Sequence, residues 1–188
     1  MIAPPVIPDE HRLPELPIAS VPRRTIAYLA DILLLAIVLF SVQGLLKEFA
    51  FGGATMAWQH EGPKLYAFVV GTFSLPVWLY FTFFESGARG ATLGKRLLRI
   101  RVSTPTGEGI GRGKAFLRTL VKLVPWELTH IAICLPTPIW DAGKDAVARP
   151  TLMVSTIMVG AWFGTVLLAP RAQGVHDLML GTLVVDDE

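Results

Sequence analysis

The chain has 188 residues, of which 52% are hydrophobic and 17% are charged, with a formal net charge of +2 at pH 7. This composition excludes an ordinary soluble domain, in which about a quarter of the residues are charged, and it is typical of an integral membrane protein. The single cysteine, Cys134, excludes an internal disulfide and a zinc site made of several cysteines.

The first 22 residues contain six prolines and show no hydrophobic periodicity. A segment of this kind buries too little apolar surface to fold, so we expect residues 1–22 to form a mostly disordered cytoplasmic tail. The remaining residues, 23–188, are predicted to form one transmembrane domain.

Three stretches with at most one charged residue each are close to the roughly 20 residues that a helix needs to cross a bilayer. They cover residues 25–46, 65–84 and 151–169. The first is too long and too far from the N-terminus for a cleaved signal peptide. A fourth stretch, residues 118–140, is interrupted by charges and prolines, and topology favours it as a crossing. We therefore predict an all-α membrane protein, a bundle of about four transmembrane helices.

The basic residues are concentrated after residues 65–84, in the loop that leads into residues 118–140 and in the start of that stretch. Nine of the seventeen fall between Glu85 and Lys122, Lys122 included. The positive-inside rule places this loop and both termini in the cytoplasm, and the protein in the cell membrane with several crossings. The loop has no array of aromatic residues for base stacking, so we expect no nucleic acid as a partner. The expected counter-charge is the anionic lipid headgroup, contacted by Lys95, Arg96, Arg99 and Arg101.

Two short segments have the composition of β-strands. Leu98, Ile100 and Val102 alternate with polar residues, and residues 182–185 form a second run rich in β-branched residues. Unpaired strand edges favour pairing, so we predict a small two-stranded β element at the cytoplasmic surface. The two runs lie on the same side only if the chain crosses the membrane an even number of times, which is why residues 118–140 are included as a span.

The strongest candidate for a functional site is the carboxylate of Asp31, inside the first predicted span. Arg24, Tyr28 and Asp31 are spaced i, i+4 and i+7, so on a helix they share one stripe. An acid at membrane depth needs a partner, and we expect Arg24 and Tyr28 to reach Asp31 in the bundle interior. Two interpretations remain open: a structural clamp, and a site for an ion, a proton or a solute.

Glu127 and His130 lie three residues apart in the fourth predicted stretch and form a second candidate. Dinuclear metal sites in bundles use two Glu-x-x-His copies with further glutamates, so we predict a hydrogen-bonded pair and no metal. Residues 90–96 fail as a phosphate loop in spacing and in lacking Ser or Thr after the lysine. No cofactor is expected. Asp177, after His176, is interpreted first as a helix cap and alternatively as part of a titrating pair.

Several motifs together resemble the RDD family of membrane proteins, named for one arginine and two aspartates. In chain order they are Arg24 and Asp31, residues 91–96 (Ala-Thr-Leu-Gly-Lys-Arg), Ile100, Arg101 and Val102, Gly107, Arg118, His176 and Asp177, Gly181, Thr182 and Val184. The resemblance extends from about residue 20 to residue 186 and offers Asp177 as the second acid. It implies a helical membrane fold and a poorly defined molecular role, for which the buried charges suggest solute or ion transport.

Two functions follow as hypotheses. The first is ion- or proton-coupled transport through the buried Arg and Asp residues, with Glu127 and His130 lining the path. The second is a non-catalytic membrane scaffold or accessory subunit whose charge pairs are structural. No nucleophile-base pair or cofactor motif is present, so we expect no enzyme. The expected partners are the lipid bilayer and either a second copy of the chain or another membrane protein.

Overall fold

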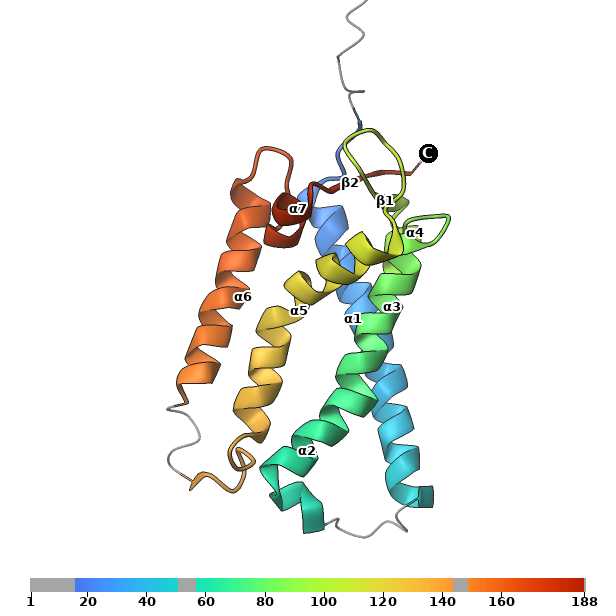
Figure 1. The fold of residues 1–188 in the computed structure, drawn as a ribbon. Helices are drawn as coiled ribbons and strands as arrows, with labels where there is room; N and C mark the ends of the chain where they lie inside the picture. The colour runs from blue at the N-terminus through green and yellow to red at the C-terminus, as the bar shows by residue number, and fades with distance from the viewer. Residues whose placement is uncertain (1–15, 51–56, 144–148, 188) are drawn as a thin grey trace, which may run out of the picture.

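The computed structural model describes residues 16–50, 57–143 and 149–187. Long helices run between the two ends of an elongated bundle (Figure 1). They are α1 (Val21–Leu45), α2 (Gly62–Val69) continued by α3 (Leu75–Ser86), α5 (Arg112–Cys134) and α6 (Pro150–Leu168). Two short helices and two strands gather at one end, which we call the sheet end: α4 (Leu93–Leu97), α7 (Val175–Leu180), β1 (Ile100–Ser103) and β2 (Leu183–Asp186).

Three stretches of helix in the described residues are long and apolar enough to cross a membrane: Val21–Phe49, Gly62–Ser86 and Pro150–Leu168. They coincide with three of the predicted spans; the first two are wider than predicted, and the third is shifted by one residue. Their large apolar side chains face outward; Leu33 is 63% exposed and Ile157 is 70% exposed. A helix that presents this much apolar surface requires a hydrocarbon environment, so the bundle belongs in a bilayer.

The helix α5 extends over the same length as its neighbours, but it is more polar and is not one of these three candidates (Figure 1). The helix begins at Arg112, before the predicted start at residue 118, and ends at Cys134, so the predicted end at residue 140 is wrong. It ends two residues before Pro136, since the residue that precedes a proline is disfavoured in helical geometry. Its role as a fourth crossing remains a prediction.

The second span contains a wide turn just before a proline. Residues Val70–Ser74 form a π-helical turn, η3, and Pro76 follows in the first turn of α3. Proline has no N–H to donate and its ring crowds the preceding turn, which explains the break in regular α-helix at this position. Within this turn, the Thr72 hydroxyl donates to the Phe68 carbonyl oxygen at 2.8 Å.

At the sheet end, β1 pairs antiparallel with β2, with Val102 opposite Val184, which confirms the predicted two-stranded element. The predicted tail is too long, because residues 16–20 pack on this sheet. Ile18 forms a bridge with Val185, and the Ala19 amide donates to the Val184 carbonyl at 3.0 Å. Pairing with an open strand edge satisfies the backbone of a segment that has no periodicity of its own. Residues 1–15 of the predicted tail lie outside the described residues.

Glycines in α2 and α6 differ in whether they allow close packing against another segment. A Cβ on Gly62 would overlap the carbonyl oxygen of Pro136, so this glycine permits the close approach of α2 to the segment after α5. Gly160 and Gly164 form the Gly-x-x-x-Gly pair of α6, yet a Cβ on either would meet nothing within 4 Å. Within the described part of this chain, the pair therefore brings no helix close to α6.

Candidate functional site

The carboxylate of Asp31 is fully buried on α1 and is bonded entirely by neutral groups. Its Oδ1 accepts from the Tyr80 hydroxyl at 2.6 Å and from the Gly94 amide at 2.7 Å. Its Oδ2 accepts from the Thr92 hydroxyl at 2.6 Å. Three donors from α3, α4 and the turn before α4 therefore replace the water that this acid loses on burial.

Gly94 explains how the backbone comes close enough to donate. A Cβ on Gly94 would overlap the Ala27 carbonyl oxygen and lie 2.9 Å from Cγ of Asp31, so only glycine fits between α4 and α1. Thr92 also caps α4, accepting from the Lys95 amide at 3.4 Å. The glycine run that fails as a phosphate loop thus forms part of the Asp31 site.

A second buried carboxylate, Glu85 at the end of α3, is surrounded by cations. Its Oε1 accepts from Lys95 at 2.6 Å and from Lys122 at 3.1 Å, and its Oε2 pairs with Arg118. Burial lowers the pKa of Lys95, and the nearby Glu85 opposes this shift. The Lys122 ammonium also lies 3.4 Å from the centroid of the Phe81 ring, a cation-π contact.

The third buried carboxylate, Asp177 on α7, joins α1 and α5. It pairs with Arg118 and with Arg24, each at 2.7 Å, and accepts from the Thr182 hydroxyl at 2.8 Å. Its Oδ2 also accepts from the Gly174 amide at 3.2 Å, so the predicted helix cap is confirmed. Burial acts to raise the pKa of Asp177, but Arg118 and the other neighbouring cations outweigh it and hold that pKa well below its usual range.

His176 lies beside this carboxylate, with Nε2 3.5 Å from Oδ2 of Asp177. Burial lowers the pKa of His176 to about 3, against a smaller opposing effect of Asp177. The ring is therefore neutral at pH 7, and the alternative of a pair that titrates near neutrality loses its support.

The predicted contact between Arg24 and Asp31 is wrong. Seven residues along a helix separate the two backbone positions by about 10 Å, whereas α7 brings Asp177 into direct contact with the guanidinium of Arg24. Tyr28 does not bond Asp31 either; its hydroxyl accepts from Nε1 of Trp126 at 3.0 Å. The stripe does face the interior as predicted, since all three of its residues line one cavity.

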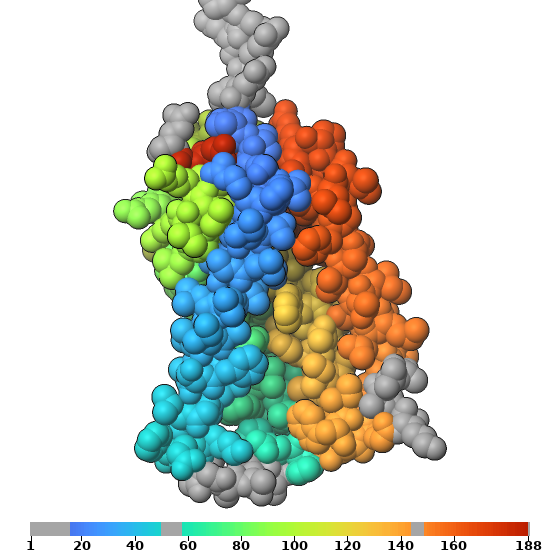
Figure 2. Space-filling view, turned by 180° about the vertical axis from the view of Figure 1, so that it is seen from behind, coloured from blue at the N-terminus to red at the C-terminus, as the bar shows by residue number. Residues whose placement is uncertain are grey.

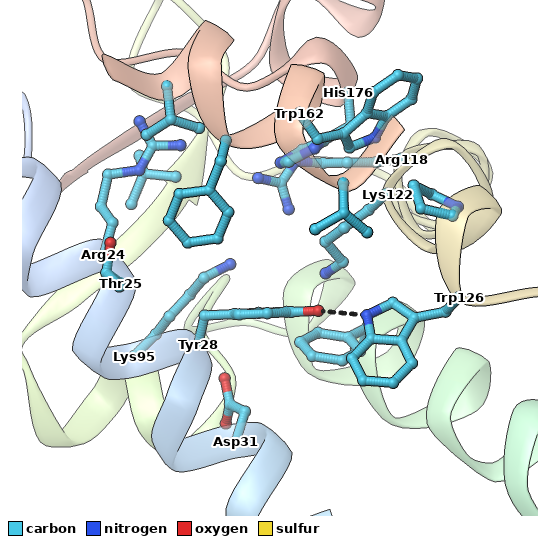
Figure 3. A pocket seen from close by; sticks show the side chains of 16 residues that line it. Arg24, Thr25, Tyr28, Asp31, Lys95, Arg118, Lys122, Trp126, Trp162 and His176 are labelled. Carbon is cyan, nitrogen blue, oxygen red and sulfur yellow. Dashed lines mark hydrogen bonds between the residues drawn. The ribbon is translucent and has the colours of Figure 1, made fainter. Parts of the chain in front are cut away.

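This cavity has a volume of about 260 Å³ and lies between α1, α5 and α6, close to the sheet end. Figure 3 shows the Lys95 and Lys122 ammonium groups pointing into it, with Arg24 on one side and Arg118 and His176 on the other. Apart from Thr25, Tyr28 and Asp31, the rest of the wall is apolar or aromatic and comes mainly from α5 and α6: Phe81, Pro125, Trp126, Val159, Trp162, Phe163, Val166 and Val184.

Glu127 and His130 lie close together, but their Oε1 and Nδ1 atoms are 3.7 Å apart, which is too far for the predicted hydrogen bond. The Ser74 hydroxyl bonds the same Nδ1 at 3.2 Å instead. Neither residue lines the cavity described above. The structure therefore separates them from the buried ion pairs at the sheet end.

The four residues predicted to contact lipid headgroups divide into two groups. Lys95 is largely buried and paired with Glu85, so it lies inside the bundle and apart from the other three. Arg96 lies 5.0 Å from the centroid of the Phe84 ring. Arg96, Arg99 and Arg101 line a surface groove together with Arg89. Their contact with lipid remains a prediction.

Sequence reasoning missed several residues of the buried network, namely Tyr80, Glu85, Thr92 and Lys122. Two signals were available. Glu85 is the first acid after a long apolar stretch, and Arg118 and Lys122 are spaced i, i+4, so they share a helix face.

A bundle of outward-facing apolar helices, closed at one end by buried ion pairs and a small sheet, defines a helical integral membrane protein. The chain belongs to the RDD family, whose family model matches residues 18–181. This confirms the resemblance carried by the sequence motifs. No curated protein and no solved structure matches the chain.

Proposed function

We propose that this RDD family protein is a non-catalytic membrane scaffold or accessory subunit, in which the buried charges hold the sheet end on the transmembrane helices. The observation that carries this proposal is the saturation of three buried carboxylates. Each of the six oxygens of Asp31, Glu85 and Asp177 accepts at least one hydrogen bond from a buried or partly buried donor.

The donors also come from the elements that a clamp has to join. Asp31 connects α1 with α3 and α4, Glu85 connects α3 with α4 and α5, and Asp177 connects α7 with α1 and α5. An acid that binds and releases a cation or a proton during transport needs a ligand position that opens. A carboxylate with every oxygen occupied is better suited to a fixed structural role.

Ion- or proton-coupled transport is the second candidate, favoured by one observation. Asp31, Arg24 and Tyr28 all line the cavity of about 260 Å³, so these groups border space inside the bundle. In this alternative Asp31 exchanges its bonds with Tyr80 and Thr92 for a cation. For either function, the expected partner is a second copy of the chain or another membrane protein.

A double-mutant cycle on Arg24 and Asp177 tests the structural role. Arg24→Gln and Asp177→Asn each remove one member of a buried pair, which we expect to lower the free energy of unfolding in detergent by about 1 to 3 kcal/mol. The double variant should lose less than the sum of the two. The exposed pair of Glu61 and Lys64 is the control, because such pairs contribute under about 1 kcal/mol.

Cation and proton flux into sealed liposomes, measured for the wild-type protein and for Asp31→Asn, distinguishes the two functions. A structural role predicts that cation and proton flux in the wild-type protein does not exceed that of empty liposomes, and that the variant changes only stability. Flux that is present in the wild-type protein and absent in a folded Asp31→Asn variant would overturn the scaffold in favour of transport. Additive losses in the Arg24 and Asp177 cycle would also count against the clamp.

A further inference from the structure

The cavity between α1, α5 and α6 carries more positive than negative charge. Four cations line it, Arg24, Lys95, Arg118 and Lys122, and of the carboxylates only Asp31 does. Glu85 and Asp177 pair with these cations but do not line the cavity. In the part of the chain that the structure describes, the hydrogen bonds to Asp31 come from neutral groups and none comes from a cation. The other two carboxylates are therefore shared among four basic side chains.

The surplus is concentrated at one carboxylate. Glu85 has three cations around it, Lys95, Arg118 and Lys122, of which the two ammonium groups share a single oxygen. Both lysines line the cavity and point into it (Figure 3). A buried ammonium group without a full counter-charge is costly, and a bound anion removes that cost.

The mouth of the cavity faces the apolar surface of the bundle. Seen from behind, the surface is hollowed between α1 and α6, with α5 at the floor of the hollow (Figure 2). The side chains at this mouth are exposed and apolar, including Val159 at 46% and Phe163 at 50% exposure. A ligand that enters from this side comes from the lipid phase.

We propose that this cavity binds an anionic phospholipid of the surrounding bilayer, with its headgroup phosphate at Lys95 and Lys122. The aromatic and apolar wall of α5 and α6 then lies along the first part of the lipid chains. The volume of about 260 Å³ is just below the roughly 300 to 1,000 Å³ of small-molecule sites, so it accommodates a headgroup while the chains remain in the membrane.

The site is distinct from the arginine groove at the surface. That groove is lined by Arg89, Arg96, Arg99 and Arg101, and none of them lines the cavity. Substitutions of cavity residues therefore test lipid binding in the cavity while the residues of the arginine groove stay unchanged.

Tryptophan quenching measures occupancy directly, because Trp126 and Trp162 line the cavity. The full-length protein in detergent is titrated with bromine-labelled phosphatidylglycerol or bromine-labelled phosphatidylcholine. We expect the anionic lipid to reach half-maximal quenching at a concentration about five-fold lower, the preference that one favourable cation supplies near a membrane surface. Trp162→Phe should remove a large part of the quenched signal.

Two variants locate the binding. Lys122→Gln should abolish the preference for the anionic lipid, whereas Lys64→Gln, an exposed lysine on α2, should leave it unchanged. Val159→Phe fills the mouth without altering any charge, so it should weaken quenching by both lipids even if Lys122→Gln does not fold. Val154→Phe is its matched control, since Val154 lies on the same helix, is similarly exposed and does not line the cavity.

Four results would overturn the proposal. Equal quenching by the two lipids would remove the role of charge. An unchanged preference in Lys122→Gln or unchanged quenching in Val159→Phe would place the binding elsewhere. Displacement of the anionic lipid by an excess of inorganic phosphate would assign the site to a free anion.

Discussion

At the scale of single residues, the feature that most restricts this structure is the contact between Gly94 and Asp31. The acid is tolerated at membrane depth because a backbone N–H and two hydroxyls reach it, and the N–H does so only where a helix carries no side chain. Gly94 thus matters as much as Asp31, because the absence of a side chain on Gly94 lets its own N–H reach the carboxylate.

Gly94→Ala tests this contact. The added methyl group would collide with the Ala27 carbonyl, push α4 away from α1 and leave Oδ1 of Asp31 with a weaker set of donors. We expect a loss of about 2 to 4 kcal/mol in the free energy of unfolding, the sum of overpacking and a lost bond to a buried charge. Thermal unfolding in detergent measures it. Gly109→Ala is the control, because a Cβ there meets nothing within 4 Å; equal stability of the two variants would exclude the proposed role of Gly94.

At the scale of elements, α7 is a short helix at the sheet end whose one acidic residue contacts two long helices. It has six residues, yet Asp177 on it binds α1 and α5, and Gly174 and Thr182 at its two ends bond the same carboxylate. Since so short a helix has little stability of its own, its position depends on these bonds and on the burial of a neutral His176.

The low pKa of His176 predicts how this element responds to acid. Because the pKa is about 3 in the folded protein and 6.5 is the ordinary value, only the unfolded chain gains this proton as the pH falls from 7 to 5. The wild-type protein should therefore lose about 2 kcal/mol of stability over that interval through this residue.

His176→Gln supplies the comparison for this pH dependence. The variant lacks the titrating ring, so its stability should change less between pH 7 and pH 5, whatever its stability at pH 7. Asp177, the closest acid to His176, stays ionised in this interval because its pKa is held below its usual value. Parallel stability curves for the wild-type protein and the variant would show that His176 is not buried in its neutral form.

At the scale of the whole molecule, the charges and the apolar surface occupy different places. The sheet and both ends of the described chain lie at the sheet end, and the three candidate spans extend from there (Figure 1). The ion pairs of Glu85 and Asp177 involve α4 and α7, the two short helices at this end. Because the chain starts and finishes at the same end, it passes along the bundle an even number of times. This arrangement supports α5 as the fourth crossing and the cytoplasm as the location of the sheet end, given the basic residues there.

Reporter fusions test this topology. A fluorescent reporter fused after Glu188 should be active in the cytoplasm, and alkaline phosphatase at the same position should be inactive. The same two reporters fused after Glu61, which precedes α2 at the opposite end of the bundle, should give the reverse result. Phosphatase activity after Glu188 would mean an odd number of crossings and would remove α5 from the membrane.

The amino-acid sequence alone determined the class of protein, three of the spans, the pairing of the two strands and the inward direction of Arg24, Tyr28 and Asp31. These follow from length, hydropathy and helical phase, which are local properties of the chain. Only the tertiary structure decided the partners: Arg24 bonds Asp177 and not Asp31, Lys95 turns inward to Glu85, and Gly94 faces Asp31. Such pairs join segments separated by 10 to 153 residues, so which donor reaches which acid depends on how the helices pack, and that is not written in local periodicity.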